Sequence, residues 1–265
     1  MGTPIFRLEW PGRGFGNSLM MAHLTQILVD NGIDAVFNHR RKTTGLVDVP
    51  VLDPSDHQKR IVFNGILPSD FTTKMIEEPV MMYFIRDFMK MTGKNIEFDR
   101  KRHNYVPVHF IEVDNIKGAD VALCTKTGTW TPYRNWPYFD ELKKMLQVSG
   151  ISYIDLNNPL ILSNDCLNIV AKSKVYVGLD TGTSHYVSKF ANGKGLIIQG
   201  GFNQFFYWAW QYEYEPIVTT VECPYRPCFI NKNNIYSGIV CDRGVSCISK
   251  ISVQQVFNKI VEKLK

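Results

Sequence analysis

Residues 180–185, Asp-Thr-Gly-Thr-Ser-His, combine a carboxylate, three hydroxyl groups and an imidazole within six positions. They follow the short apolar run KVYVG at 174–178, which is typical of a strand covered on both faces. The residues after them have helical spacing, so the motif is expected between the carboxyl end of a strand and the amino end of a helix. Free backbone N–H groups and the helix dipole attract anions there. An ordinary helix cap by the Asp or the Ser is the alternative interpretation.

A second group of polar residues lies in the loop 125–136, TKTGTWTPYRNW, between an expected strand and an expected helix. The guanidinium of Arg134 can bind phosphate oxygens through two parallel hydrogen bonds. The hydroxyl groups of Thr127 and Thr129 can donate to the same kind of group. A plain surface arginine is the alternative interpretation of Arg134.

The loop of residues 11–16, PGRGFG, places three glycines between an expected strand and an expected helix. Its spacing is G-x-G-x-G, whereas a dinucleotide-binding fingerprint needs G-x-G-x-x-G and an acidic residue at the end of the next strand. Basic residues follow the next strand, at 39–42, which disfavours a nicotinamide dinucleotide. The glycines still allow a ligand to approach the backbone at a helix amino end.

Strands and helices alternate along the chain, which predicts α/β domains with parallel sheets. Strands are expected at 4–10, 34–38, 60–66, 120–124, 151–156, 174–178 and 195–199, and residues 105–113 are expected to be extended. Helices are expected at 17–32, about 70–91, 137–150, about 163–172, 184–192 and 252–264. Two series, each opening with a strand and a glycine-bearing loop, predict Rossmann-like domains at 1–116 and 117–265.

Composition excludes several classes of protein. The 265 residues are 45% hydrophobic and 21% charged, with a net charge of +5, which is ordinary for a globular chain. No apolar run is long enough to span a membrane, and the first residues lack the apolar core of a signal peptide. A cytoplasmic protein, expected to be a monomer, fits these features. The modest charge suits an enzyme that handles phosphorylated ligands.

From about residue 119 onward the chain resembles the heptosyltransferases of glycosyltransferase family 9. Residues 128–146 resemble the family's phosphate-binding loop, with hydroxylated residues, a basic residue, Trp-Pro and a helix. Residues 177–190 resemble its Asp-(Ser/Thr)-Gly-x-x-His nucleotide-sugar motif, and residues 197–208 the strand and loop that follow. The resemblance implies the GT-B fold, with two facing Rossmann-like domains. The first half matches only through its strand, glycine loop and helix.

The resemblance implies a metal-independent transfer of a sugar from a nucleotide-diphosphate sugar to an acceptor hydroxyl, with inversion and with no required cofactor. The donor-binding residues would be Thr127, Thr129, Arg134, Asp180, Thr181, Gly182, Thr183 and His185. Asp180 would accept hydrogen bonds from sugar hydroxyls, and His185 would reach the diphosphate or the transferred sugar. The first domain would bind the acceptor through the loop residues Arg13, Gly14, Gly16 and Asn17.

The chain departs from the family at Asn17, where relatives usually carry an aspartate proposed as the base. An amide has no useful basicity, so Asn17 is expected to position a substrate while another group takes the proton. The candidates for that base are Glu9, His23, His39 and Asp70. A Gly-Asn pair in this loop is also similar to fucosyltransferases, which leaves the sugar open.

Four late cysteines also resemble the family's cysteine-containing tail, with the spacing C-x4-C-x12-C-x5-C: Cys223, Cys228, Cys241 and Cys247. Clustered cysteines in a cytosolic protein indicate a metal before a disulfide, but the tight C-x2-C pairs of a zinc ribbon are missing. A structural zinc ion and free thiols both stay open. Cys124 and Cys166 are expected in the core.

Two classes of function follow from the sequence. One is a glycosyltransferase whose acceptor is a polyanion, either a lipopolysaccharide-type glycan or a hydroxymethylated base in phage DNA. The other is a nucleotide-sugar-binding or regulatory module that kept the donor site and lost the base.

Overall fold

The computed structural model describes residues 6–9, 15–37, 47, 59–62, 80–99, 102–103, 105–127, 134–157, 163–200, 214–219 and 247–265. The described residues form two compact units, one up to Phe110 and one from Ile111 onward. The sequence predicts a domain boundary at 116/117. Asn168 of the second unit binds the backbone of residues 111–113, accepting from Val113 N–H and donating to the Ile111 carbonyl, each at 2.9 Å.

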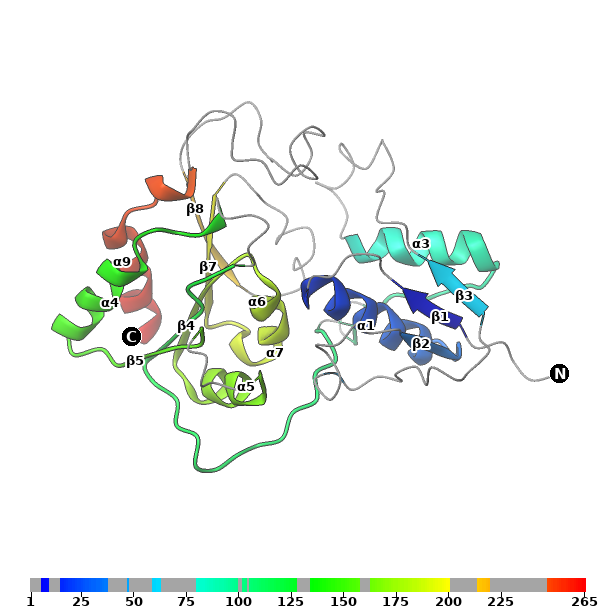
Figure 1. The fold of residues 1–265 in the computed structure, drawn as a ribbon, viewed down its shortest axis with the longest axis horizontal. Helices are drawn as coiled ribbons and strands as arrows, with labels where there is room; N and C mark the ends of the chain where they lie inside the picture. The colour runs from blue at the N-terminus through cyan, green and yellow to red at the C-terminus, as the bar shows by residue number, and fades with distance from the viewer. Residues whose placement is uncertain are drawn as a thin grey trace. The chain divides into compact units, whose positions relative to one another are not determined.

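The first unit contains a parallel three-stranded sheet in the order β2–β1–β3 (Figure 1). Its described elements are β1 (Phe6–Glu9), α1 (Phe15–Asp30), β2 (Ala35–Phe37), β3 (Lys59–Val62) and α3 (Val80–Thr92). The buried ring of Phe88 on α3 meets Phe6 on β1 edge to face, with 5.1 Å between centroids. Gly32 ends α1 with φ of +69°, a conformation that favours glycine. All five elements overlap segments that the sequence pattern predicts, and β1 and β2 lie wholly within theirs.

The second unit contains a parallel five-stranded sheet in the order β5–β4–β6–β7–β8. Its strands are β4 (Val121–Leu123), β5 (Tyr153–Asp155), β6 (Val175–Leu179), β7 (Gly195–Gln199) and β8 (Glu215–Val218). Its helices are α4 (Phe139–Val148), α5 (Ser163–Lys172), α6 (Gly182–Tyr186), α7 (Ser188–Ala191), the 3-10 helix η2 (Cys247–Lys250) and α9 (Val253–Leu264). Strand β8 was not expected, and the single helix expected after Asp180 is instead the two short helices α6 and α7.

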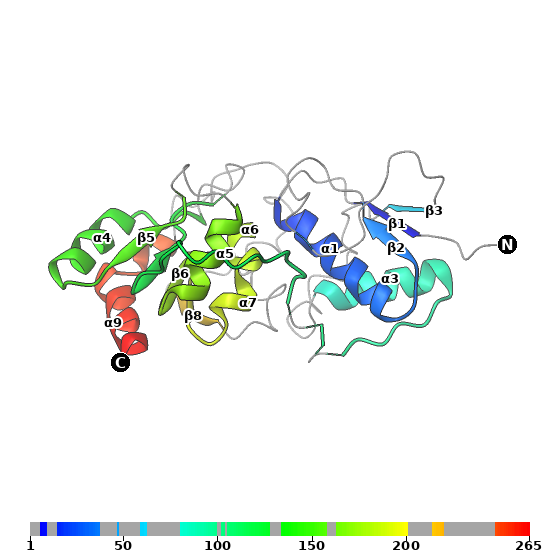
Figure 2. The ribbon, with the colours of Figure 1, turned by 90° about the horizontal axis from the view of Figure 1, so that it is seen from below.

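The helices of the second unit cover both faces of its sheet. Figures 1 and 2 show α4 and α9 together on one side, and α5, α6 and α7 on the other. This layered arrangement explains why β6 and β7 are buried at every position. The sheet is therefore a doubly wound α/β sheet.

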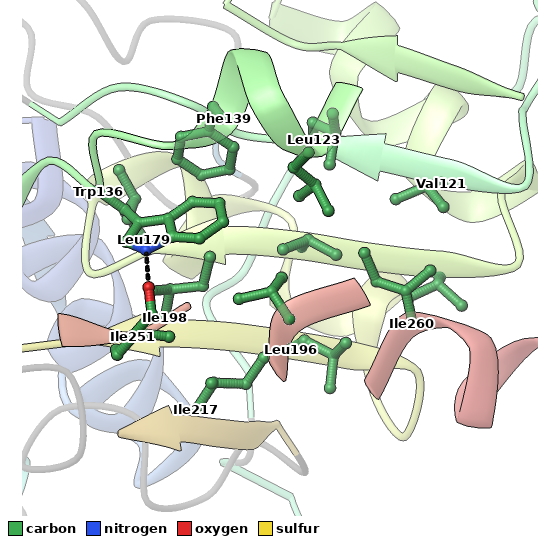
Figure 3. Close-up of a cluster of buried hydrophobic side chains, with 14 of the residues drawn as sticks. Val121, Leu123, Trp136, Phe139, Leu179, Leu196, Ile198, Ile217, Ile251 and Ile260 are labelled. Atoms are coloured by element: carbon green, nitrogen blue, oxygen red, sulfur yellow. Dashed lines mark hydrogen bonds between the residues drawn. The ribbon is translucent and has the colours of Figure 1, made fainter. Parts of the chain in front are cut away.

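The face toward α4 and α9 is packed with apolar side chains (Figure 3). Alternate residues of the central strands, such as Leu179, Leu196 and Ile198, meet Leu142 of α4 and Ile260 of α9 there. The indole Nε1 of Trp136 donates to the Ile251 carbonyl at 2.9 Å, which joins the start of α4 to the chain just before α9. Cys124 and Cys166 are buried, as expected. Burial raises the pKa of Cys124 to about 12 and that of Cys166 to about 11, so both remain thiols.

None of the helices in the described part of the chain has the length and apolar composition that crossing a membrane requires. The predicted start of α1 needs a correction: the helix includes Phe15 and Gly16, so Gly16 and Asn17 belong to a helix and not to the preceding loop. Gly16 lies in the first described turn of α1 and not in the helix interior, where a glycine would be more destabilising.

Candidate functional site

The order of strands in the second sheet places its topological switch point between β4 and β6. The chain goes from β4 to β5 on one side, then returns to continue with β6 on the other. In open α/β sheets, ligands bind at the carboxyl ends of the strands that flank such a point. The segments that follow β4 and β6, residues 124–127 and 180–183, are therefore the natural place for a ligand.

A buried ion pair lies at the carboxyl edge of the sheet, where β4 and β6 end. Arg134 Nη1 donates to the Asp180 backbone carbonyl at 2.7 Å and lies 3.4 Å from Asp180 Oδ2. Arg134 is 8% exposed and Asp180 is 5% exposed. Because both groups are buried, loss of either charge from the pair should be strongly destabilising. The two residues are 46 positions apart, so the fold brings the two sequence motifs into direct contact.

Two neighbours of Arg134 hold its loop in place. Trp136 is anchored to Ile251, as described above. Asn135 Oδ1 accepts from both the backbone N–H and the hydroxyl of Thr127, at 2.8 and 3.0 Å. The Thr127 hydroxyl, which was expected to donate to a ligand, therefore also ties the two ends of the loop together.

A second polar network fixes the chain directly after β4. Asn157 Oδ1 accepts from the backbone N–H groups of Thr125 and Lys126, at 2.6 and 3.0 Å. The Thr125 hydroxyl lies 3.1 Å from both carboxylate oxygens of Asp155, and Lys143 Nζ lies 2.7 Å from Asp155 Oδ2. These bonds hold the exposed cation Lys126 at the same edge of the sheet as Arg134.

The end of β6 is joined to α6 through Ser184. Its hydroxyl donates to the Leu179 carbonyl at 2.7 Å and accepts from the Tyr176 hydroxyl, also at 2.7 Å. Tyr214 donates to the Ser184 carbonyl at 2.8 Å. Any side chain at Gly178 would collide with this network, because a Cβ there would lie 2.5 Å from the Tyr176 hydroxyl. Burial holds the pKa of Tyr176 well above its ordinary value, so the phenol stays neutral.

The predicted donor motif begins directly after β6. Thr181 has an extended backbone, with φ of −150° and ψ of 159°, and α6 starts at Gly182 without a side-chain cap. Thr181, Gly182 and Thr183 are half-buried, whereas His185 is 5% exposed. Because α6 has only five residues, its dipole is weak, and an anion there would depend mainly on individual N–H groups.

Several predicted site residues lie outside the described part of the chain: Arg13, Gly14, Thr129, Cys223, Cys228 and Cys241. Asn17 lies in α1, and Cys247 is buried at the start of η2. Within the described ranges, no three His, Cys, Asp or Glu residues are close enough to hold a metal ion.

Sequence reasoning did not single out Asn135, Asn157, Lys126 or Gln199. All four lie at or just beyond the carboxyl ends of strands, or bind residues that do. Marking every polar residue at the end of a predicted buried strand and within two positions after it would have found Lys126 and Gln199. The two asparagines act through contacts 8 and 32 residues away along the chain, which no local pattern reveals.

Comparison with known proteins gives matches in structure. No family model matches the sequence, and no curated protein matches it. The dodecameric iron-containing glycosyltransferase TibC of enterotoxigenic E. coli H10407 matches with a TM-score of 0.67 and 14% identity, over 100% of this chain and 77% of TibC. A family 9 glycosyl transferase of Veillonella parvula matches with a TM-score of 0.54 and 12% identity, over 100% of this chain and 98% of that protein.

E. coli ADP-heptose LPS heptosyltransferase II matches with a TM-score of 0.53 and 11% identity, over 98% of each chain. At these identities the likeness concerns the fold. Together with the two parallel α/β sheets and the switch point between β4 and β6, the matches show that this chain has the GT-B fold of the heptosyltransferases.

Proposed function

We propose that the protein is a glycosyltransferase that moves a sugar from a nucleotide-diphosphate sugar to an acceptor hydroxyl. The observation that carries the proposal is the buried Arg134–Asp180 pair at the switch point of a sheet with this fold. One of the structural matches, TibC, has been crystallised with ADP-D-beta-D-heptose. A nucleotide-diphosphate sugar is a ligand of the same class.

The donor half of the reaction requires stabilisation of the diphosphate as it leaves. A guanidinium has five N–H donors, so Arg134 can hold Asp180 through Nη1 while another edge faces phosphate oxygens. The backbone N–H groups of Thr181, Gly182 and Thr183, with the hydroxyls of Thr127 and Thr129, would add donors without a metal ion. Asp180 would accept from hydroxyls of the transferred sugar. His185 would contact the diphosphate or that sugar.

The acceptor half requires a base. The acceptor oxygen would attack the anomeric carbon opposite the diphosphate, so that the bond to the phosphate oxygen breaks and the configuration inverts. A base would take the hydroxyl proton. We assign Arg13, Gly14, Gly16 and Asn17 to positioning of the acceptor, with the base elsewhere in the first domain.

The role of Asn17 is tested with Asn17→Ala and Asn17→Asp. We expect Asn17→Ala to lower turnover and to keep the basic limb of the pH–rate profile, because a separate group still takes the proton. Asn17→Asp should raise turnover only if the loop lacks a base, and a general base contributes about 10²- to 10⁴-fold. Unchanged rates and pH profiles in both variants would exclude Asn17 from the acceptor site.

The proposed activity is tested first with the donor. A panel of ADP-, UDP- and GDP-sugars is screened by thermal shift, because a ligand that binds only the folded state raises the melting temperature. Donor hydrolysis or sugar transfer is then measured with the sugar that binds. Binding without either reaction would support the alternative, an inactive nucleotide-sugar-binding module. If no nucleotide sugar binds, both fail.

The proposed acceptor is a polyanion, either a lipopolysaccharide-type glycan or hydroxymethylated DNA. Basic residues cluster at 39–42 and 100–103, outside the donor motifs. DNA binding would weaken steeply as salt increases, since phosphate contacts release counterions. Salt-dependent binding to DNA, compared with transfer onto core glycans, separates the two acceptors.

We also propose that the late cysteines hold a structural metal ion. Their four thiolates would suit zinc or iron, and TibC is described as iron-containing. The fourth, Cys247, is buried at the start of η2. The next residue, Ile248, packs closely on Gly200, since a Cβ added at Gly200 would lie 3.1 Å from Ile248 Cβ. Metal analysis of the purified protein, with Cys247→Ser as the control, would identify the ion or show free thiols.

Cytoplasmic localisation and a monomeric state complete the proposal. TibC is described as dodecameric, so the size of this protein in solution is a direct test of the expected monomer. Light scattering after gel filtration would measure it.

A further inference from the structure

Gln199 occupies a position next to the proposed donor site, and the proposed mechanism gives it no role. It is the last residue of β7 and is 1% exposed. The parallel register pairs Leu179 of β6 with Ile198 of β7. Asp180 and Gln199 are therefore the next residues on two adjacent strands, at the same carboxyl edge.

The alternation of side chains along β7 shows on which face of the sheet Gln199 lies. Leu196 and Ile198 belong to the apolar cluster on the side of α4 and α9 (Figure 3). In a strand, residues at odd and even positions point to opposite faces, so Gln199 belongs with the other face, where Tyr176 meets α6 through Ser184. Gln199 is thus on the side of the sheet that carries the donor motif.

The side-chain amide of Gln199 is buried without compensation. Its Oε1 and Nε2 atoms have no contact with solvent and, among the residues that the structure describes, no hydrogen-bond partner. The backbone carbonyl of the same residue does have one, since it accepts from Thr219 N–H at 3.3 Å. Burial of an amide without a partner lowers stability, and natural proteins rarely keep such a group without a ligand or a water to satisfy it.

We propose that Gln199 recognises sugar hydroxyl groups of the nucleotide-sugar donor, an inference that rests on the proposed function. A carboxamide has one oxygen that accepts and one nitrogen that donates. Phosphate oxygens only accept, so a diphosphate would leave Oε1 without a partner. A pair of neighbouring hydroxyls both donates and accepts, and so satisfies both atoms. In this arrangement Arg134 binds phosphate oxygens, and Gln199, on the neighbouring strand to Asp180, forms hydrogen bonds with the sugar.

The test uses Gln199→Met, which keeps the length of the side chain and removes both polar atoms. Two measurements are made on this variant and on the wild type: the melting temperature without ligand, and the dissociation constants for a nucleoside diphosphate and its sugar conjugate, chosen from the panel above. We expect the variant to melt a few degrees higher, because an unpaired buried amide is gone. We expect it to bind the sugar conjugate at least about tenfold more weakly.

The two ligands distinguish the ribose, which both of them contain, from the transferred sugar, which is present in the sugar conjugate alone. A loss with the sugar conjugate alone assigns Gln199 to the transferred sugar, and a loss with both ligands assigns it to the ribose. The matched control is Gln254→Met, at an exposed glutamine of α9 whose side chain donates to Asn258 in the same helix, and it should leave affinity unchanged.

Three outcomes would count against this reading, and they differ in what they overturn. A lower melting temperature of Gln199→Met would show that the amide has a partner within the protein. Equal affinities of variant and wild type for both ligands would remove Gln199 from the site and leave the proposed function intact. Failure of the wild type to bind any nucleotide sugar would overturn the proposed function, and this inference with it.

Discussion

Each unit of the molecule contains a buried cluster of polar side chains, and the two clusters differ in their place in the fold. The histidine cluster of the first unit consists of His23, His103 and Asp30. The edge cluster of the second unit consists of Arg134 and Asp180. Four of these five residues are less than a tenth exposed, and Asp30 is slightly more so.

The histidine cluster connects α1 to the segment that follows α3. His23 Nε2 lies 3.1 Å from the His103 carbonyl oxygen, and His103 Nε2 lies 3.2 Å from Asp30 Oδ2. The other ring nitrogen of His103 accepts from Asp99 N–H at 3.1 Å. Because α1 runs back along the sheet from β1 to the start of β2, its last turn lies at the amino ends of the strands. This edge is not where α/β sheets bind ligands.

Burial of polar groups does not by itself mark a functional site. His103 Nε2 lies 3.2 Å from Asp30 Oδ2 but, among the described residues, makes no well-aligned hydrogen bond. The histidine cluster is assigned to structure because of its place at the amino ends of the strands, and this also argues against His23 as the base of the reaction. The edge cluster lies at the switch point, with an unsatisfied Gln199 on the neighbouring strand. Substitutions in the first cluster should therefore change stability alone, and substitutions in the second should change stability and donor binding together.

The largest effect is expected at Arg134. Arg134→Met removes the guanidinium that pairs with the buried Asp180 carboxylate, which should cost about 3–5 kcal/mol of unfolding free energy. The double variant Arg134→Met, Asp180→Leu should recover part of this loss without recovering donor binding. Denaturant unfolding and calorimetric titration measure the two quantities. The control is Arg102→Met in the first unit, whose exposed ion pair with Asp30 should be worth at most about 1 kcal/mol.

If Arg134→Met alone left both stability and donor affinity unchanged, the edge cluster would have no special role. A double variant as unstable as the single one would show that the two charges do not compensate each other.

The next effect is a pH dependence that belongs to the first unit. Burial lowers the pKa of His23 from 6.5 to about 4. Below pH 6.5 this histidine takes up a proton in the unfolded chain but not in the folded one. Its contribution to stability is therefore fully present above pH 6.5, and the free energy of unfolding falls by about 3 kcal/mol as the pH decreases to 4. His23→Gln, which keeps a donor for the His103 carbonyl, should remove this dependence. A variant that lost stability between pH 6.5 and 4 as steeply as the wild type would refute the assignment.

The smallest expected effect is a difference in donor affinity between variants of two buried serines in the second unit. Ser184→Ala removes the hydroxyl between Tyr176 and the Leu179 carbonyl, and should cost about 1–3 kcal/mol. Ser173→Ala should cost a similar amount, since that hydroxyl bonds Ile169 and Ala119 near the amino end of β6. Only Ser184→Ala should also weaken donor binding, because it loosens α6. Equal donor affinity in both variants would show that the position of α6 does not matter to the site.

Much of the fold follows from local patterns in the sequence. The helices at 163–172 and 253–264 and the strand at 195–199 lie where apolar periodicity and caps predict them, because their burial pattern is regular. Strand β8 was missed because it is short, contains Pro216 and is partly exposed at the edge of the sheet. The interruption between α6 and α7 falls at Val187, and it was missed because residues 184–192 contain no glycine or proline that would indicate a break.

The site was predicted as separate residues and not as an arrangement. Hydroxylated and charged residues are visible in the sequence, where the loop 125–136 and the motif 180–185 point to Arg134 and Asp180 as separate candidates. Their direct contact depends on the strand order, which brings residues 46 positions apart together. The importance of Gln199 depends on the register of β7 against β6, which sequence patterns do not specify.

The bond between Trp136 and Ile251 has a consequence for the order of events during protein synthesis. It joins residues 115 positions apart, and α9 completes the same core with Val256 and Ile260. The nascent sheet of the second unit must therefore wait, with its apolar face uncovered, until residues beyond 250 have left the ribosome. During that interval the face is open to chaperones and to aggregation.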